Sequence, residues 1–449
     1  MARGNPNRLL AGLLDEAGWN TGELVRAVVA LGSAQGISVS YDRTAPAHWL
    51  NGARPRPPVP ALVAEAFSQR LRRVVTAAET GLVDVERVPE QRRREPVKGA
   101  GVELVSELVE LCRAMLDPEE GPRLAAGPYE SQAARPVALW TPPVRRGVRE
   151  AGARAGAVVL HDLARTFASL GVRNGGAQIR PLLAAYLAHG VRPEWVRGER
   201  ELIAGYAQLA NLLGVSAMDS GHPRSAQRAF ALALGLARAG GSREVWAITS
   251  RTMSAQAYEL GYVDEAQELA GEAAQEVQGL GAARAFVVVH QAVMEAQGGG
   301  DAVALMAEAE RAWESSPAPS VGSVGPFTAY PRSALDFQRF RVCRALGERE
   351  KALSALRAAA RHRPAAQRRP YALLHAQLGE ELLGLGMVSA ACGAWSTFVD
   401  QYPLVWSARA DAALVRMCEL LAPWSDQSRV RALLERGHGL RGWSPGLRR

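Results

Sequence analysis

Apolar residues between positions 5 and 82 recur every three or four residues, which is the spacing of one face of an α-helix. The first stripe ends at Ala17 and follows Asn5-Pro6, which suits an N-cap with proline at the first helical position. The second follows Asn20 and Glu23, whose spacing is that of a capping box. The pattern predicts short, consecutive helices packed around one small core.

A third short helix is predicted between Asp42, which suits an N-cap, and the Asn-Gly pair at 51–52, which suits a helix end. Trp49 is expected to face the core from this helix. Arg43 and Thr44 occupy the first turn, where the side chains of a helix laid in the DNA major groove reach base edges. These residues indicate a DNA-recognition helix.

The rest of this domain is expected to be a fourth helix over 60–73 and a short fifth helix opened by a capping box of Thr76 and Glu79. The connection over 32–41 is longer than the three or four residues that usually join the helices of a helix-turn-helix. Pro46 lies early in the third helix, where it is tolerated because first-turn N–H groups have no intrahelical partner.

From residue 144 the chain is predicted to be helical to its end, and small and aromatic residues repeat in a fixed order. The turn glycines of four such units are Gly221, Gly261, Gly347 and Gly386. In the first and last units Gly214 and Gly379 stand in the first helix, and Phe230 and Trp395 stand in the second. This order resembles the tetratricopeptide pattern, in which small residues let paired helices approach each other and an aromatic ring fills the gap between units.

The length of 449 residues is too great for one compact domain, and the 48% hydrophobic content is ample for real cores. The net charge of +8 is distributed unevenly. Residues 1–76 carry nine arginines against five acidic residues, a net charge of +4 that suits contact with DNA phosphates.

The four cysteines stand far apart among apolar neighbours and are expected to be reduced thiols of the core; they are Cys112, Cys343, Cys392 and Cys418. No phosphate-binding loop, nucleophile elbow or zinc-protease motif occurs, so we expect neither an enzyme nor a metal or other cofactor. No apolar segment suits a signal peptide or a membrane helix, so we expect a cytoplasmic protein.

Several N-terminal blocks match one regulator family: Glu16-Ala-Gly-Trp19, Tyr41-Asp-Arg-Thr44, His48-Trp-Leu50, Gly52 and Arg54-Pro-Arg-Pro-Pro58. With the repeats, they make the chain resemble the Streptomyces-type (actinobacterial) transcriptional regulators. Those proteins join an N-terminal Cro/C1-type helix-turn-helix domain to a tetratricopeptide-like array, and some repress sporulation and antibiotic production. Two positions depart from the Cro/C1 pattern, since Thr21 replaces the usual Gln and Leu50 the usual Glu.

The expected fold is therefore all-α. A Cro/C1-like five-helix DNA-binding domain is expected over 1–83. A linker is expected over 84–143, and it contains one helix, over 102–116, and a Pro/Gly-rich segment. A tetratricopeptide-like α-superhelix is expected over 144–449. The resemblance implies a sequence-specific transcriptional regulator, a repressor of development or secondary metabolism, controlled by a partner or ligand on its repeat domain.

Helix geometry predicts which side chains face double-stranded DNA when Trp49 points to the core. Arg43 suits a bidentate contact to guanine, and the residues of the second helix and of the following loop suit phosphates. The predicted DNA-binding residues are Thr21, Arg43, Thr44, Ala47, His48, Arg54 and Arg56.

The repeat array is expected to bind a peptide or protein effector on its inner surface, because stacked helix pairs form a concave groove. The predicted groove residues are Arg251, Tyr258, Arg341 and His375. We also expect a homodimer formed through the helical region, with 404–449 as a dimer contact or an end cap. The alternative function is an interaction scaffold whose helix-turn-helix-like domain contacts protein rather than DNA; a hydrolase or transferase hidden in the helical region has no motif to support it.

Overall fold

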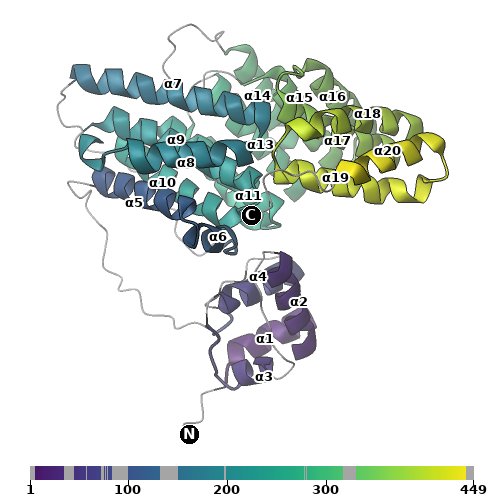
Figure 1. Cartoon of the computed structure of the whole chain (residues 1–449), viewed down its shortest axis with the longest axis horizontal. Coiled ribbons are helices and arrows are strands. Elements are labelled where there is room, and N and C mark those ends of the chain that lie inside the picture. The colour runs from purple at the N-terminus through teal and green to yellow at the C-terminus, as the bar shows by residue number, and fades with distance from the viewer. Residues whose placement is uncertain are drawn as a thin grey trace.

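The computed structural model describes residues 6–34, 45–56, 58–71, 75, 77, 79–82, 100–131, 150–196, 199–277, 279, 281–316 and 330–440. Within these ranges the chain forms helices and turns and contains no β-strand (Figure 1). The predicted fold class is confirmed at this level: the protein is all-α, and most of its helices form a superhelix of repeated pairs.

The described part of the N-terminal domain contains four helices: α1 (Arg8–Ala17), α2 (Thr21–Ala34), α3 (Ala45–Leu50) and α4 (Val59–Leu71). They share one core, whose fully buried side chains include Leu10, Leu24, Leu62 and Phe67. The ring of Trp19 packs on Phe67 with 5.6 Å between centroids. The Arg70 guanidinium lies 5.9 Å from the Trp19 ring, and its Nε donates to the Ala17 carbonyl at 3.0 Å. Trp19 therefore belongs to the packed core of this domain.

Caps fix where the first two helices begin. The predicted capping box is confirmed, since Asn20 N–H donates to Glu23 Oε2 at 2.7 Å and Glu23 N–H donates to Asn20 Oδ1 at 3.0 Å. The cap of α1 is Asn7 rather than the predicted Asn5, with Leu10 N–H donating to Asn7 Oδ1 at 3.1 Å. Asn7 Nδ2 also donates to the Thr80 carbonyl at 2.9 Å, which ties the start of α1 to a distant turn.

The short fifth helix expected near 76–82 is not seen in the described residues of that stretch. Residues 77 and 79–81 form turns, and residues 76 and 78 lie outside the described ranges. Gly81 has a φ of 66°, and a Cβ atom there would fall 2.4 Å from Asn7 Oδ1. The chain therefore passes directly over the start of α1, where only glycine fits.

The remaining helices form the helical-repeat domain. Their bounds are α5 (Ala100–Leu116), α6 (Glu120–Ala125), α7 (Glu150–Asn174), α8 (Gly176–Gly190), α9 (Arg200–Asp219), α10 (Pro223–Gly240), α11 (Arg243–Glu259), α12 (Val263–Glu276), α13 (Ala282–Gly298), α14 (Ala302–Glu314), α15 (Arg332–Ala345), α16 (Arg349–His362), α17 (Arg368–Gly384), α18 (Val388–Gln401), α19 (Ala408–Leu421) and α20 (Ser428–Leu440). Short 3-10 turns occur at η1 (Pro193–Val196), η2 (Tyr402–Leu404) and η3 (Ala422–Trp424).

Consecutive helices pack as pairs joined by tight turns, from α9 with α10 through α17 with α18 (Figure 1). The four turn glycines predicted from the sequence all have positive φ, between 73° at Gly386 and 90° at Gly261. This left-handed conformation is easy for glycine and strained for residues with a Cβ atom. The predicted turns are therefore confirmed.

Close packing inside two pairs explains their small and aromatic residues. A Cβ atom at Gly214 would fall 2.4 Å from the Phe230 ring, and one at Gly379 would fall 2.6 Å from the Trp395 indole. Phe230 and Trp395 are both fully buried. The glycine in the first helix thus makes room for the ring of the second.

Helix α5 lies in the segment that the sequence analysis assigned to the linker, yet it packs on α8 and α10. Its Val105 and Leu108 are fully buried in the same core as those helices. Helix α6 occupies part of the Pro/Gly-rich segment that was expected to be irregular. The predicted burial of the four unpaired cysteines is confirmed.

The C-terminal pairs return to the beginning of the repeat domain. Asp219 at the end of α9 is 2% exposed and accepts from Arg369 at 2.5 Å, Ser407 Oγ at 2.7 Å and the Gly176 N–H at 2.7 Å. Trp406 N–H donates to the Asn174 carbonyl at 2.8 Å. Helices α17 and α7 are also in contact. We call these contacts around Asp219 the closure contact.

Candidate DNA-facing surface and arginine cluster

The short helix α3 presents one face to solvent and one to the core. Ala47 and His48 are exposed, whereas Trp49 is 4% exposed and packs among α1, α2 and α4. The Leu50 carbonyl accepts from Asn7 N–H at 2.8 Å, so the end of α3 is fixed to the start of α1. This arrangement holds a small outward face on a rigid support.

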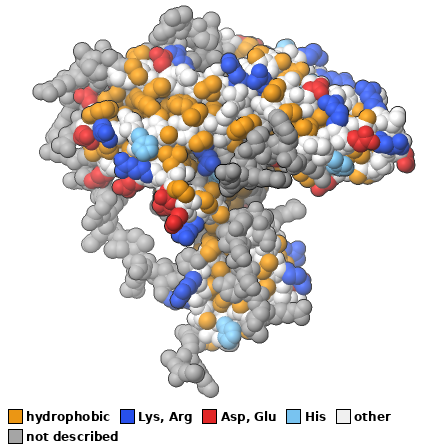
Figure 2. Space-filling model, in the orientation of Figure 1, with side chains coloured by type: hydrophobic (Ala, Val, Ile, Leu, Met, Phe, Trp, Pro, Cys, Tyr) orange, Lys and Arg blue, Asp and Glu red, His pale blue; other side chains and the backbone are white. Residues whose placement is uncertain are grey.

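The segment after α3 continues the exposed surface with two cations. Ala53 N–H donates to the His48 carbonyl at 2.9 Å, which closes the turn, and Arg54 and Arg56 beyond it are exposed. Thr21, the first residue of α2, is half-buried. Figure 2 shows Lys or Arg side chains on both flanks of the N-terminal domain. The predicted residues Arg43 and Thr44 lie outside the described residues, as does the proposed cap Asp42.

Glu65 is a residue of the N-terminal domain that the sequence analysis missed. It is 7% exposed on α4 and accepts from Gln69 Nε2 at 2.8 Å. Burial raises the pKa of its carboxyl to about 7, and the Gln69 hydrogen bond offsets part of that rise. The signal was present in the sequence, because Glu65 stands among the apolar residues of the fourth predicted helix.

In the repeat domain, three of the four predicted groove residues lie together. The Arg251 guanidinium on α11 lies 4.1 Å from the Phe286 ring centroid, and that of Arg341 on α15 lies 5.1 Å from the Tyr258 ring. We call Arg251, Tyr258, Phe286 and Arg341 the arginine cluster. His375, the fourth predicted residue, lies on α17 against Tyr371, with 4.5 Å between ring centroids.

Arg251 is the most buried cation of this cluster. It is 9% exposed, and among the described residues it has neither an ion pair nor a hydrogen bond to its guanidinium. The pKa of Arg251 is lowered to about 10, mainly by burial and in part by the nearby Arg341 charge. A guanidinium in this position remains charged at neutral pH.

A buried histidine lies next to the cluster and was also missed by the sequence analysis. His290 follows an apolar run on α13 and is fully buried. Ser254 Oγ donates to the Ala266 carbonyl at 2.6 Å, which leaves His290 Nε2 as the donor to Ser254 Oγ at 2.8 Å. Burial lowers the pKa of His290 well below its usual value, and the charges of Arg251 and Arg341 add to this effect. His290 is therefore neutral.

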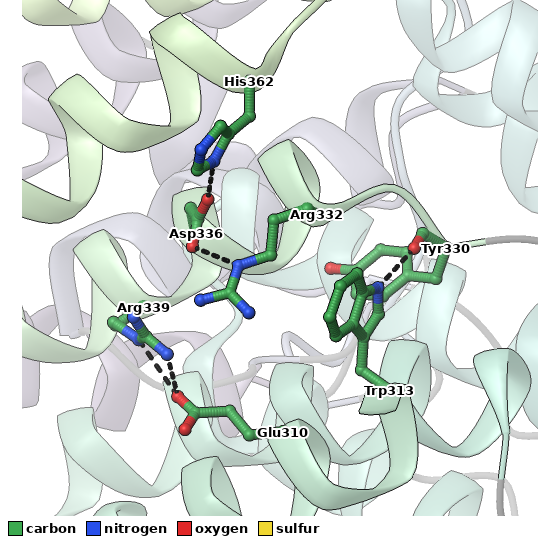
Figure 3. Close-up of polar contacts among 7 residues, drawn as sticks. All are labelled: Glu310, Trp313, Tyr330, Arg332, Asp336, Arg339 and His362. Atoms are coloured by element: carbon green, nitrogen blue, oxygen red, sulfur yellow. Dashed lines mark hydrogen bonds and ion pairs between the residues drawn. The ribbon is translucent and has the colours of Figure 1, made fainter. Parts of the chain in front are cut away.

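A second polar group joins α14, α15 and α16 (Figure 3). Asp336 is 1% exposed and accepts from Arg332 Nε at 3.0 Å, with His362 Nδ1 at 2.7 Å from its other oxygen. Arg339 forms an ion pair with Glu310 across the α14–α15 boundary. These contacts hold neighbouring helices in register, and they leave the Asp336 carboxylate fully engaged.

The His, Cys, Asp and Glu side chains of the described residues do not gather into a group of three or more that could hold a metal ion. Among the helices in the described ranges, none has the length and apolar character that crossing a membrane requires.

Residues 10–83 are similar to the family described as the SP15 N-terminal domain, and this region begins within α1 and ends just beyond the turn at Gly81. None of the curated proteins matches the chain.

Proposed function

We propose that the protein is a sequence-specific DNA-binding transcriptional regulator, and that a partner or ligand on its repeat domain controls it. One observation carries the proposal. The exposed pair Ala47 and His48 is backed by buried Trp49 and fixed to α1 through the Asn7–Leu50 hydrogen bond. Recognition helices need such an outward face on a rigid support.

Charge supports the same proposal. Arg54 and Arg56 are exposed just after α3, on a domain with a positive net charge. Phosphate contacts by arginine position a protein on the duplex, while the helix face reads the bases. We propose that Thr21, Arg43 and Thr44 add to this surface. The order of these residues along the chain resembles that of a Cro/C1-type domain. We further propose a homodimer that presents two such faces to paired half-sites.

The pairing of helices supports the remaining part of the proposal. The glycine and aromatic contacts of α9–α10 and α17–α18 are those expected of tetratricopeptide-like units. We propose that the repeats transmit binding of an effector to the DNA-binding domain. A repressor of development or secondary metabolism is the specific role that the family resemblance favours.

The full-length protein should recover specific DNA segments in a genome-wide pull-down. On a recovered segment, Ala47→Glu should weaken binding at least tenfold, about 1.4 kcal/mol, because it places a carboxylate against the phosphates. Arg43→Ala should cost about 1–3 kcal/mol on that segment and little on non-specific DNA. Gel shifts at fixed salt measure both effects.

Ala30→Glu is the matched control, because Ala30 is exposed near the other end of α2. It should bind DNA like the wild type. Recovery of partner proteins without any enriched DNA would instead favour the scaffold function. Equal weakening by Ala47→Glu and Ala30→Glu would show that net charge alone is responsible.

A further inference from the structure

We propose that the arginine cluster is a binding site for an anionic group, a carboxylate or a phosphate, carried by the ligand of the repeat domain. The starting observation is Arg251, which is 9% exposed as a residue and whose Nε is buried without a hydrogen-bond partner among the described residues. Burying a cation costs free energy unless it is paired and hydrogen-bonded. Stacking on Phe286 satisfies its face but none of its five N–H donors.

A second cation faces the same region. Arg341 comes from α15, two helix pairs after Arg251, and stacks on Tyr258. Its Nη1 donates to Gln338 at 3.2 Å, a neutral acceptor, so this contact leaves its charge uncompensated. Like charges held close together in a buried setting repel each other, and an anion between them removes that repulsion.

The nearby carboxylates of the chain compensate the two charges only in part, because each also pairs elsewhere, and Glu259 is the one whose charge raises the pKa of both arginines. Glu259 forms an ion pair with Arg409. Asp336 is held between Arg332 and His362 (Figure 3). Neutral His290 contributes no positive charge, and its Nδ1 is buried without a hydrogen-bond partner among the described residues. It offers an acceptor for an O–H or N–H group of the same ligand.

Guanidinium groups bind carboxylates and phosphates through paired N–H donors, and the two rings of the cluster suit an apolar or planar part beside the anion. Acidic peptides and small organic acids or phosphates share this chemistry. The biological use of the site rests on the proposed regulatory function, but the binding itself can be tested without DNA.

The test uses the full-length protein at constant ionic strength with four probes: inorganic phosphate, succinate, a short glutamate-containing peptide and the same peptide with glutamine in place of glutamate. Thermal unfolding and calorimetry should show that at least one anionic probe stabilises and binds the wild type. The glutamine peptide should do neither. The probe that binds most tightly distinguishes a peptide from a small acid or phosphate.

Arg251→Met and Arg341→Gln should each weaken that binding at least tenfold, whereas Arg349→Gln, at an exposed arginine of α16, should leave it unchanged. Without any probe, Arg251→Met should melt no lower than the wild type, because it removes an uncompensated buried charge and keeps the apolar stem. If Arg251→Met does not fold, binding by the site is still tested with Arg341→Gln and with Arg251→Lys, which retains the charge.

Binding of every anionic probe with wild-type affinity by Arg251→Met and Arg341→Gln would overturn the site. So would the absence of binding by all three anionic probes. Either result would leave the DNA pull-down unaffected, so failure of this inference and failure of the proposed function are separate outcomes.

Discussion

At the scale of single residues, Gly379 shows how one missing side chain determines a helix pair. It lies in the middle of α17, where a glycine ordinarily weakens a helix relative to alanine. A Cβ atom there would fall 2.6 Å from the fully buried Trp395 indole. The need for close approach therefore outweighs helix propensity at this position.

Gly379→Ala is expected to destabilise the protein by about 1–3 kcal/mol, because the added methyl group forces the fully buried Trp395 indole to shift. Gly384→Ala on the same helix is the control, since a Cβ atom at Gly384 meets nothing within 4 Å. That change should be neutral or stabilising by about 0.5–1 kcal/mol. Thermal unfolding of the two full-length variants measures the difference, and equal melting temperatures would show that the indole can adjust.

Residue types predicted the glycine and aromatic contacts because their effect is local and repeats along the chain. Arg251, Tyr258, Arg341 and His375 were assigned to the inner surface of the array because they stand in the first helices of their units. The same reasoning could not predict that Arg251 and His290 are buried, or which side chains pack around them. Burial of a charge without a counter-charge depends on which helices pack around it, and that is decided by distant parts of the chain.

At the scale of elements, α4 contains a carboxyl whose ionisation opposes folding. Burial raises the pKa of Glu65 from 4.5 to about 7. Below pH 4.5 the carboxyl is protonated in both the folded and the unfolded state. As the pH rises from there towards 7, the unfolded chain ionises first, so the free energy of unfolding decreases and then levels off at higher pH.

Glu65→Gln should remove this loss and stabilise the N-terminal domain by about 1–3 kcal/mol at pH 8, with a smaller effect at pH 5. Hydrogen exchange of the α4 amides in the full-length protein, corrected for intrinsic rates, measures it. Asp15→Asn removes an exposed carboxylate from α1 of the same domain and serves as the control. A gain that is equal at both pH values would argue against ionisation as its cause.

The elements also show where sequence reasoning succeeds. The Asn20–Glu23 capping box was predicted because both partners lie within one turn of each other. The start of α1 was misplaced by two residues because Asn7 is also held by the Thr80 carbonyl, a contact across most of the domain. The turn near Gly81 was predicted as a helix for the same reason: its conformation follows from packing on Asn7.

At the scale of the whole molecule, the closure contact joins segments that the sequence gives no reason to pair. Asp219 lies at the end of α9, whereas Arg369 and Ser407 belong to the C-terminal pairs. The segment beginning at 404 was expected to act as a dimer contact or an end cap. Within it, Trp406 N–H donates to the Asn174 carbonyl and the Trp406 carbonyl accepts from Ala177 N–H, so this segment is joined to the connection between α7 and α8 of the same chain.

Asp219 is ionised in this contact. Burial raises the pKa of its carboxyl, but the Arg369 charge and the hydrogen bonds from Arg369, Ser407 and Gly176 outweigh burial, and the net shift is downward. A lowered pKa in the folded state means that the contact stabilises the fold above the ordinary pKa of 3.8 and that this stability is lost as the pH falls through the lowered value. The closure contact should therefore be intact at neutral pH.

Asp219→Ala should separate the C-terminal pairs from α8 and α9, because it leaves the half-buried Arg369 without its counter-charge. The expected cost is on the order of 3 kcal/mol. Amides of α17 and of the segment around Trp406 should then exchange faster, while those of α11 and α12 remain protected. Glu380→Ala is the control, since Glu380 pairs with a largely exposed arginine, Arg416, on the surface and such pairs contribute little. Uniformly faster exchange throughout the repeat domain would show that the superhelix unfolds as one unit, and unchanged exchange would show that the C-terminal pairs are held by their apolar contacts alone.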